Sequence, residues 1–135
     1  MLRPASLLTP EIAALLSRAM FPDPARIERT LEAYRTEGEQ RLFVWDVGGQ
    51  TVSAAGLRVS GRAAEVLHIG THPDAGEKGY GRGLLRAIAA HLNLSQLMAE
   101  TDDDSVEFYR RSGFEIMEAP ARGGRRRYLC TLTAP

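Results

Sequence analysis

The chain has 135 residues, of which 44% are hydrophobic and 25% charged, and its formal net charge at neutral pH is zero. These values are ordinary for one folded domain, and the length is too short for two domains with separate cores. A zero net charge gives no electrostatic reason to expect a nucleic acid or a membrane surface as partner. The single cysteine, Cys130, excludes an internal disulfide and fits a reducing compartment.

The N-terminal segment has no pattern of a secretory signal, because Pro4, Pro10 and Glu11 interrupt its apolar residues. No run of apolar residues approaches the roughly eighteen that a membrane-spanning helix needs. We therefore expect a cytoplasmic protein without a membrane span.

Two helices are predicted at the start of the chain. Thr9 and Asp23 have the chemistry of N-caps, and each is followed by a proline, which is favoured in the first helical turn. Apolar residues at helical spacing follow each cap, and Gly38 is expected to end the second helix. The two apolar faces consist of Ile12, Leu15, Leu16 and Ala19, and of Ile27, Leu31 and Tyr34.

The rest of the chain alternates strand and helix patterns. Strands are predicted at 41–47 and 51–60 around a Gly48-Gly49 hairpin turn, and then at 63–71, 96–101, 114–118 and 125–133. A helix follows the glycine turn near residue 80, and a short one spans 102–113. A short strand at Leu2-Arg3 would add to this order. The sequence predicts a single α/β domain over residues 1–135, with one mixed sheet flanked by helices.

The segment EKGYGRGLL, residues 77–85, is a glycine-rich turn that opens a helix, a typical site for an anion. A nucleotide-binding P-loop would need Lys followed by Ser or Thr at its end, whereas Arg82 and Gly83 stand there. A dinucleotide fingerprint would need a different glycine spacing, and three antiparallel strands precede the turn. Neither of these two anion sites fits.

The turn resembles the coenzyme A pyrophosphate loop of the GNAT superfamily of N-acetyltransferases, R/Q-x-x-G-x-G/A. Lys78, Gly79, Tyr80 and Gly81 match its x-G-x-G part, while Gly76 stands where the family has Arg or Gln. A second segment, DDDSVEFYRRSGF, resembles the family's N-x-x-A-x-x-[FL]-Y-x-x-x-G-F element over residues 102–114. The resemblance covers about residues 1–119 and implies a mostly antiparallel GNAT-like acyl-CoA N-acyltransferase fold.

The resemblance also implies roles for individual residues. It implies that acetyl-CoA is the co-substrate, that backbone amides around 69–71 polarise the acetyl carbonyl, and that Tyr109 protonates the departing sulfur. Glu65 stands fourteen residues before Gly79, where the histone-acetyltransferase branch has its general base, and His68 is a weaker alternative. The implied cofactor-binding residues are Ile69, Gly70, Thr71, Glu77, Lys78, Gly79, Tyr80, Gly81, Arg82, Gly83, Asp102 and Phe108.

Several of these residues also have plain structural interpretations. Tyr109 follows Val106 at helical spacing and fits an apolar core, and Gly70 is either a packing gap or, as we expect, a strand bulge. Asp104 and Glu107 have the D-x-x-E form of a capping box, which accounts for the acidic run without a metal. We expect no metal site, and a core position for Cys130.

The resemblance therefore implies an acyltransferase that moves an acetyl group from acetyl-CoA to a primary amine of a small molecule or a protein. A GNAT-fold module that binds acyl-CoA or a partner protein without turnover is the alternative. The sequence identifies neither the acceptor nor the oligomeric state, for which a homodimer is one option. Arg122, Arg125, Arg126 and Arg127 form a local basic run between the last two strands, which would suit an amine that also carries a carboxylate or phosphate.

Overall fold

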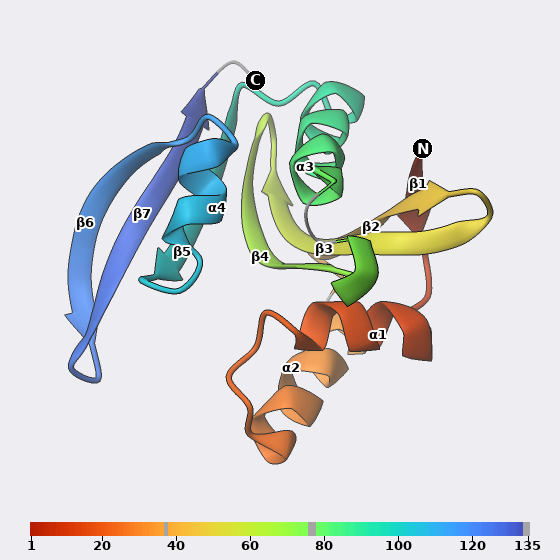
Figure 1. The fold of residues 1–135 in the computed structure, drawn as a ribbon, viewed down its shortest axis with the longest axis horizontal. Helices are drawn as coiled ribbons and strands as arrows, with labels where there is room; N and C mark the ends of the chain where they lie inside the picture. Colours follow the sequence, from red (N-terminus) through yellow and green to blue (C-terminus); the bar gives the residue numbers. More distant parts are fainter. Residues whose placement is uncertain (37, 76–77, 134–135) are drawn as a thin grey trace.

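A computed structural model describes residues 1–36, 38–75 and 78–133. They form one seven-stranded sheet with helices on both faces (Figure 1). The helices are α1 (Pro10–Ser17), α2 (Pro24–Thr36), α3 (Tyr80–His91) and α4 (Val106–Arg111), with a short 3₁₀ turn, η1, at Pro73–Ala75. The strands are β1 (Leu2–Ala5), β2 (Gln40–Val47), β3 (Gln50–Ser60), β4 (Ala63–Thr71), β5 (Gln96–Asp102), β6 (Glu115–Arg122) and β7 (Arg125–Thr133).

The strand order is β1-β2-β3-β4-β5-β7-β6, and every neighbouring pair is antiparallel except β4 with β5. This confirms the predicted mixed α/β class, the chain order of the elements and the short first strand. In the part of the chain that the structure describes, no helix is long and apolar enough to cross a membrane.

The first two helices begin where the sequence predicts. The Thr9 hydroxyl accepts a hydrogen bond from the Ile12 amide at 3.2 Å, which satisfies one of the free donors of the first turn of α1. The Asp23 carboxylate accepts from the amides of Ala25 and Arg26 at 3.0 and 3.3 Å. Both N-caps are therefore confirmed.

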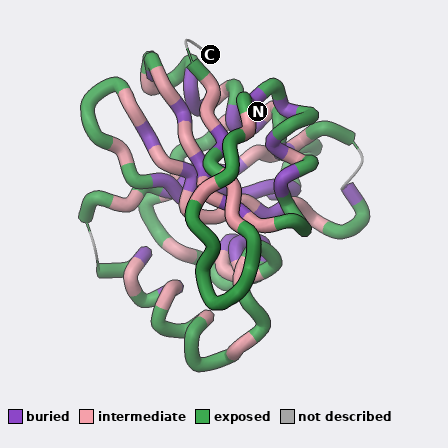
Figure 2. Tube along the Cα trace, turned by 90° about the vertical axis from the view of Figure 1, so that its left-hand side faces the viewer, coloured by how far each residue is buried: buried purple, intermediate pink, exposed green. Residues whose placement is uncertain are grey.

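Each face of the sheet has its own apolar cluster. The larger one packs α3 and α4 against the sheet, and it includes Phe43, Leu57, Leu84, Ile88 and Leu97. A smaller one packs α1 and α2 against the other face, around residues such as Leu16 and Val44. Figure 2 shows the buried residues gathered at the centre of the molecule, with exposed loops at its edges.

The sheet opens at its middle. The strands β4 and β5 pair only from Ala63–Gln96 to Val66–Ala99. Beyond this point β4 continues to Thr71 beside β3, and β5 continues to Asp102 beside β7. The last residues of β4 therefore have a strand neighbour on one side only.

Gly70 lies at a place where packing leaves no room for a side chain, and the prediction of a strand bulge at this residue is wrong. The irregularity of β4 lies at Leu67, because Gly56 and Leu57 of β3 pair with His68 and Val66, while Gly70 pairs regularly with Ala54. A Cβ at Gly70 would stand 1.8 Å from the Leu15 carbonyl oxygen of α1. Helix α1 thus lies directly on the backbone of β4.

We expect Gly70→Ala to lower the free energy of unfolding by about 3 kcal/mol, because the methyl group would displace backbone rather than a flexible side chain. Gly83→Ala is the matched control, since nothing lies within 4 Å of a Cβ at that helical position. It should leave stability unchanged or raise it by about 0.5 kcal/mol. Equal stabilities of the two variants in denaturant titrations would contradict the close packing of α1 on Gly70.

Candidate active site

A cavity of about 490 Å³ lies where β4 and β5 separate. Helix α4 and Arg127 of β7 border it on one side, and the α1–α2 connection and α2 border it on the other. It is lined by Ala19, Met20, Phe21, Arg26, Ile27, Thr30, Leu67, His68, Ile69, Thr71, Glu100, Thr101, Asp102, Ser105, Phe108, Tyr109 and Arg127.

The N-terminus of α3 meets this cavity. A Cβ at Gly81 would stand 3.1 Å from the Phe108 ring and 3.3 Å from the Thr71 hydroxyl, and both of these residues line the cavity. A side chain at residue 81 would therefore press on the Phe108 ring and the Thr71 hydroxyl, in addition to affecting any approach of a ligand. The contact joins the glycine turn to the cavity.

The first turn of α3 presents backbone donors without a side-chain cap. Gly79 is the N-cap, in the left-handed conformation with φ of 73°, and among the described residues no side chain caps the helix. The amides of residues 79–82 precede the first helical hydrogen bond, because the Gly83 amide is the first to donate to the Gly79 carbonyl. Lys78 and Arg82 are exposed beside them. This arrangement is suited to an anion.

Two of the three predicted amides on β4 face the opening of the sheet. The His72 amide donates to the Val52 carbonyl at 2.7 Å. Because hydrogen-bonded pairs alternate in an antiparallel ladder, Gly70–Ala54 is the next such pair. The Gly70 amide is thus directed at β3, whereas the amides of Ile69 and Thr71 point toward the side from which β5 has departed.

Tyr109 is both a core residue and a wall of the cavity. Its side chain is 6% exposed and its ring makes edge contacts with Phe108 and Phe114. Among the described residues its hydroxyl has no hydrogen-bond partner. Burial, chiefly, raises the pKa of Tyr109 well above the ordinary value, so the phenol stays protonated.

Glu65 does not line the cavity. It lies on β4 before the strands separate, opposite Met98, and its carboxylate is 3.4 Å from the Arg58 guanidinium. Its role as a base stays a prediction. The carboxylates that do line the cavity are Glu100 and Asp102.

The capping box predicted for Asp104 and Glu107 is wrong, because the acidic run before α4 is organised differently. Ser105 is the N-cap and makes no side-chain cap hydrogen bond. The Asp102 carboxylate instead accepts from the Asp104 amide at 3.0 Å and so closes the turn before the helix. Within 1–36, 38–75 and 78–133, no group of three or more His, Cys, Asp or Glu side chains is placed to hold a metal ion.

The remaining predicted residues are placed as follows. Tyr80 and Gly83 belong to the first turn of α3, while Glu77, like Gly76, lies outside the described residues. Cys130 is fully buried in the larger cluster, and burial raises the pKa of its thiol to about 11, which disfavours the thiolate that a nucleophile would need.

The basic run near the C-terminus does not form one patch. Arg127 lines the cavity, but it and Arg122 both bind the Glu100 carboxylate, at 3.3 and 3.2 Å. Arg126 lies 3.8 Å from Glu118. Acidic partners thus largely compensate the positive charge that, from the sequence, would bind a carboxylate or phosphate of the acceptor.

The sequence gives no indication of the cavity wall that the α1–α2 connection and α2 form. Met20, Phe21 and Ile27 come from the α1–α2 connection and from α2, where an amphipathic pattern gives no sign of a site. The cavity also contains His68, whose Nδ1 is 2.6 Å from the Tyr34 hydroxyl. Only the folded chain brings Met20, Phe21, Ile27 and Tyr34 to β4.

Comparison with known proteins identifies the family. Residues 38–116, more than half of the chain, match the model of the acetyltransferase (GNAT) domain. The chain therefore belongs to the GNAT acetyltransferases, as the sequence motifs predicted.

Solved structures share the fold over nearly the whole chain. A GNAT family acetyltransferase from Elizabethkingia anophelis with acetyl-CoA bound has a TM-score of 0.71 at 17% identity, covering 98% of this chain and 97% of its own. A Bacillus subtilis acetyltransferase in complex with CoA gives 0.73 at 19%, with 98% and 97% covered. The ribosomal-protein-S18-alanine N-acetyltransferase of Escherichia coli gives 0.70 at 20%, with 99% and 94% covered.

The burial of His68 predicts an acid-sensitive step in stability. Burial lowers the pKa of His68 to about 4, whereas an unfolded histidine titrates near 6.5. Between these values the unfolded chain binds more protons, so the free energy of unfolding falls as the pH falls. We expect this residue to account for a loss of about 2 kcal/mol between pH 7 and pH 5.

Denaturant titrations of His68→Gln at the two pH values measure this contribution. His68→Gln should lose most of the difference in the free energy of unfolding between pH 7 and pH 5. His91→Gln, which changes an exposed histidine on α3, should keep that difference. An identical pH dependence in wild type and His68→Gln would show that His68 is not held neutral by burial.

Proposed function

We propose that the protein is an acetyl-CoA-dependent N-acetyltransferase in which a primary amine attacks the thioester directly within a ternary complex. The observation that carries this proposal is the contact of Gly81 with Phe108 and Thr71. It places a helix N-terminus suited to a pyrophosphate next to a cavity that contains a buried phenol and free strand amides.

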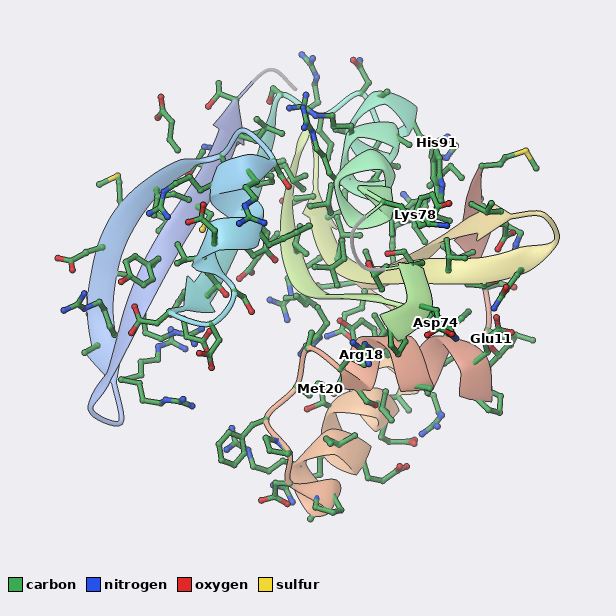
Figure 3. All side chains as sticks on the ribbon, viewed as in Figure 1. Glu11, Arg18, Met20, Asp74, Lys78 and His91 are labelled. Atoms are coloured by element: carbon green, nitrogen blue, oxygen red, sulfur yellow. The ribbon has the colours of Figure 1, made fainter. Side chains whose placement is uncertain are left out.

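The residues of the turn fit the phosphates of coenzyme A. The free amides of the first turn of α3 and the helix dipole favour negative charge, and the exposed Lys78 and Arg82 add positive charge beside them. In the view of Figure 3, Lys78 lies above the last stretch of β4 and Met20 lies below it. We infer that the coenzyme approaches from the side of α3 and the amine from the side of α1 and α2.

The opening between the strands would serve the acyl-transfer step. As the amine nitrogen bonds to the acetyl carbon, negative charge grows on the carbonyl oxygen before the carbon–sulfur bond breaks. The Ile69 amide is free to donate a hydrogen bond to that oxygen, and Thr71 offers a second amide two residues further on. Such donors favour the transition state over the ground state, because the charge is largest there.

Tyr109 would serve the departing sulfur. Its raised pKa keeps the hydroxyl protonated and also makes complete proton transfer to a thiolate unfavourable. We therefore assign it a hydrogen bond to the sulfur that strengthens as the carbon–sulfur bond breaks. The amine must also lose a proton. Glu100 and Asp102 are the carboxylates that line the cavity and could accept it, whereas Glu65 lies outside the cavity.

Release of free coenzyme A thiol from acetyl-CoA in the presence of an amine panel tests this function. An enzyme releases thiol only when an acceptor is present. A protein that merely binds acyl-CoA would show a coenzyme-dependent rise in melting temperature and no thiol, and that result would establish the alternative function.

Tyr109→Phe should lower kcat by about 100-fold with little change in KM for acetyl-CoA, because the ring and its packing remain while the donor is lost. Tyr128→Phe is the matched control, since its hydroxyl donates to Asp103 at 2.6 Å outside the cavity. Stopped-flow thiol detection under conditions where chemistry limits the rate makes the comparison. Equal kcat values for wild type and Tyr109→Phe would reduce Tyr109 to a core residue.

A further inference from the structure

The Tyr34–His68 pair joins α2 to β4 at the wall of the cavity. The Tyr34 hydroxyl lies 2.6 Å from Nδ1 of His68, and the rings meet edge to face. Gly56, which pairs with His68 across β3 and β4, makes room for the phenol, because a Cβ there would stand 2.2 Å from the Tyr34 oxygen. The position of the pair is thus fixed by the backbone of the sheet.

The direction of this hydrogen bond follows from burial. Tyr34 is 8% exposed, and burial raises its pKa, so that the hydroxyl keeps its proton. Among the described residues only His68 is available to accept that proton. Because a buried donor without a partner costs about 1–3 kcal/mol, the favoured arrangement has Tyr34 donating to Nδ1.

The tautomer of His68 follows in turn. A neutral imidazole whose Nδ1 accepts must carry its hydrogen on Nε2. Burial keeps the ring neutral at pH 7, since its pKa is lowered to about 4. The two nitrogens lie on either side of Cε1 and point in widely different directions, so Nε2–H is directed away from Tyr34. Because His68 lines the cavity and Nδ1 is occupied, Nε2–H is the polar group that its ring has left to offer there.

The charged and titratable groups around the pair do not alter this assignment. Arg58 lies close enough to Tyr34 to act on it electrostatically. The charged groups of the cavity are of both signs, and the described structure gives none of them a hydrogen bond to His68. They are Arg26, Glu100, Asp102 and Arg127, and Tyr109 is the remaining titratable group.

We propose that His68 is a fixed Nε2–H donor in the cavity and that it binds an oxygen atom which the acceptor carries beside its amine. This rests on the proposed function, because it takes the cavity to be the acceptor site. It gives His68 a positioning role and excludes it as the general base, since Nε2 already carries a proton and Nδ1 is occupied. The substrate class is an amine with a neighbouring carbonyl or carboxylate oxygen, in preference to a plain alkylamine or polyamine.

Nuclear magnetic resonance of the imidazole nitrogens tests the tautomer without any reference to turnover. The chain has only three histidines, so His68 is assigned by the loss of one set of signals in His68→Gln. We expect the Nε2–H tautomer at pH 7 in the wild type and a mixture of tautomers in Tyr34→Phe. A protonated Nδ1, or a charged ring at pH 7, would overturn the proposal.

Titration with alaninamide and with 3-methylbutan-2-amine, which has a similar shape without the carbonyl oxygen, tests the ligand class. The Nε2–H signal should shift on adding alaninamide and should stay in place with the alkylamine. Equal shifts, or no shift with either amine, would overturn the assignment of an oxygen-binding donor. This readout is separate from the thiol assay, so inactivity with both amines would count against the transferase and not against His68.

The kinetic arm uses a conservative and a disruptive variant. His68→Leu should raise KM for alaninamide at least tenfold and change kcat less. His68→Gln, which can donate from a similar position, should restore most of the affinity. If both variants raise KM for the two amines equally, the role of His68 is structural and the proposal fails.

Discussion

The separation of β4 from β5 after Val66 and Ala99 is the constraint on which the rest of the site depends. A strand inside a sheet normally has both edges hydrogen-bonded, and a buried backbone group without a partner is costly. Here the last residues of β4 pair with β3 alone, which leaves the Ile69 and Thr71 amides directed at a cavity. The opening thus creates both a cavity and free donors at its wall, which under the proposed function would be the space for the substrate and the groups that act on it.

Close contacts at three glycines, two in the sheet and one in α3, hold this opening in shape. The Leu15 carbonyl of α1 lies against Gly70, and the Tyr34 ring of α2 lies against Gly56. On the other face Phe108 and Thr71 lie against Gly81. At Gly70 and Gly56 the distance leaves no room for a Cβ, and at Gly81 a Cβ would press on its neighbours, so the two helical layers and the cavity between them are mutually positioned.

The sequence predicts those parts of the fold that follow from local chemistry. Thr9 and Asp23 cap their helices through their own side chains, and the Gly48-Gly49 turn takes the positive φ angles of a hairpin. The two GNAT motifs correctly predicted the family and, with it, the fold. The alternation of residues along a strand, in contrast, does not indicate where the sheet opens.

Most errors of prediction concern contacts made over long distances in the chain, and the capping box is the local exception. Whether Gly70 is a bulge or a packing gap depends on α1, which lies more than fifty residues earlier. The capping box failed because Asp102 competes for the Asp104 amide. The Tyr34–His68 pair and the bonds of Glu100 to two arginines join residues from different elements, and no local pattern contains them.

Amide hydrogen exchange at Ile69 tests most directly whether the opening of the sheet is the acetyl-transfer site. In the free protein the Ile69 amide should exchange quickly and the Gly70 amide slowly, because only the latter is paired with β3. Saturating acetyl-CoA should slow the exchange of Ile69 by at least about tenfold and leave Gly70 unchanged. An Ile69 amide that is already protected in the free protein, or that is unaffected by acetyl-CoA, would contradict the account.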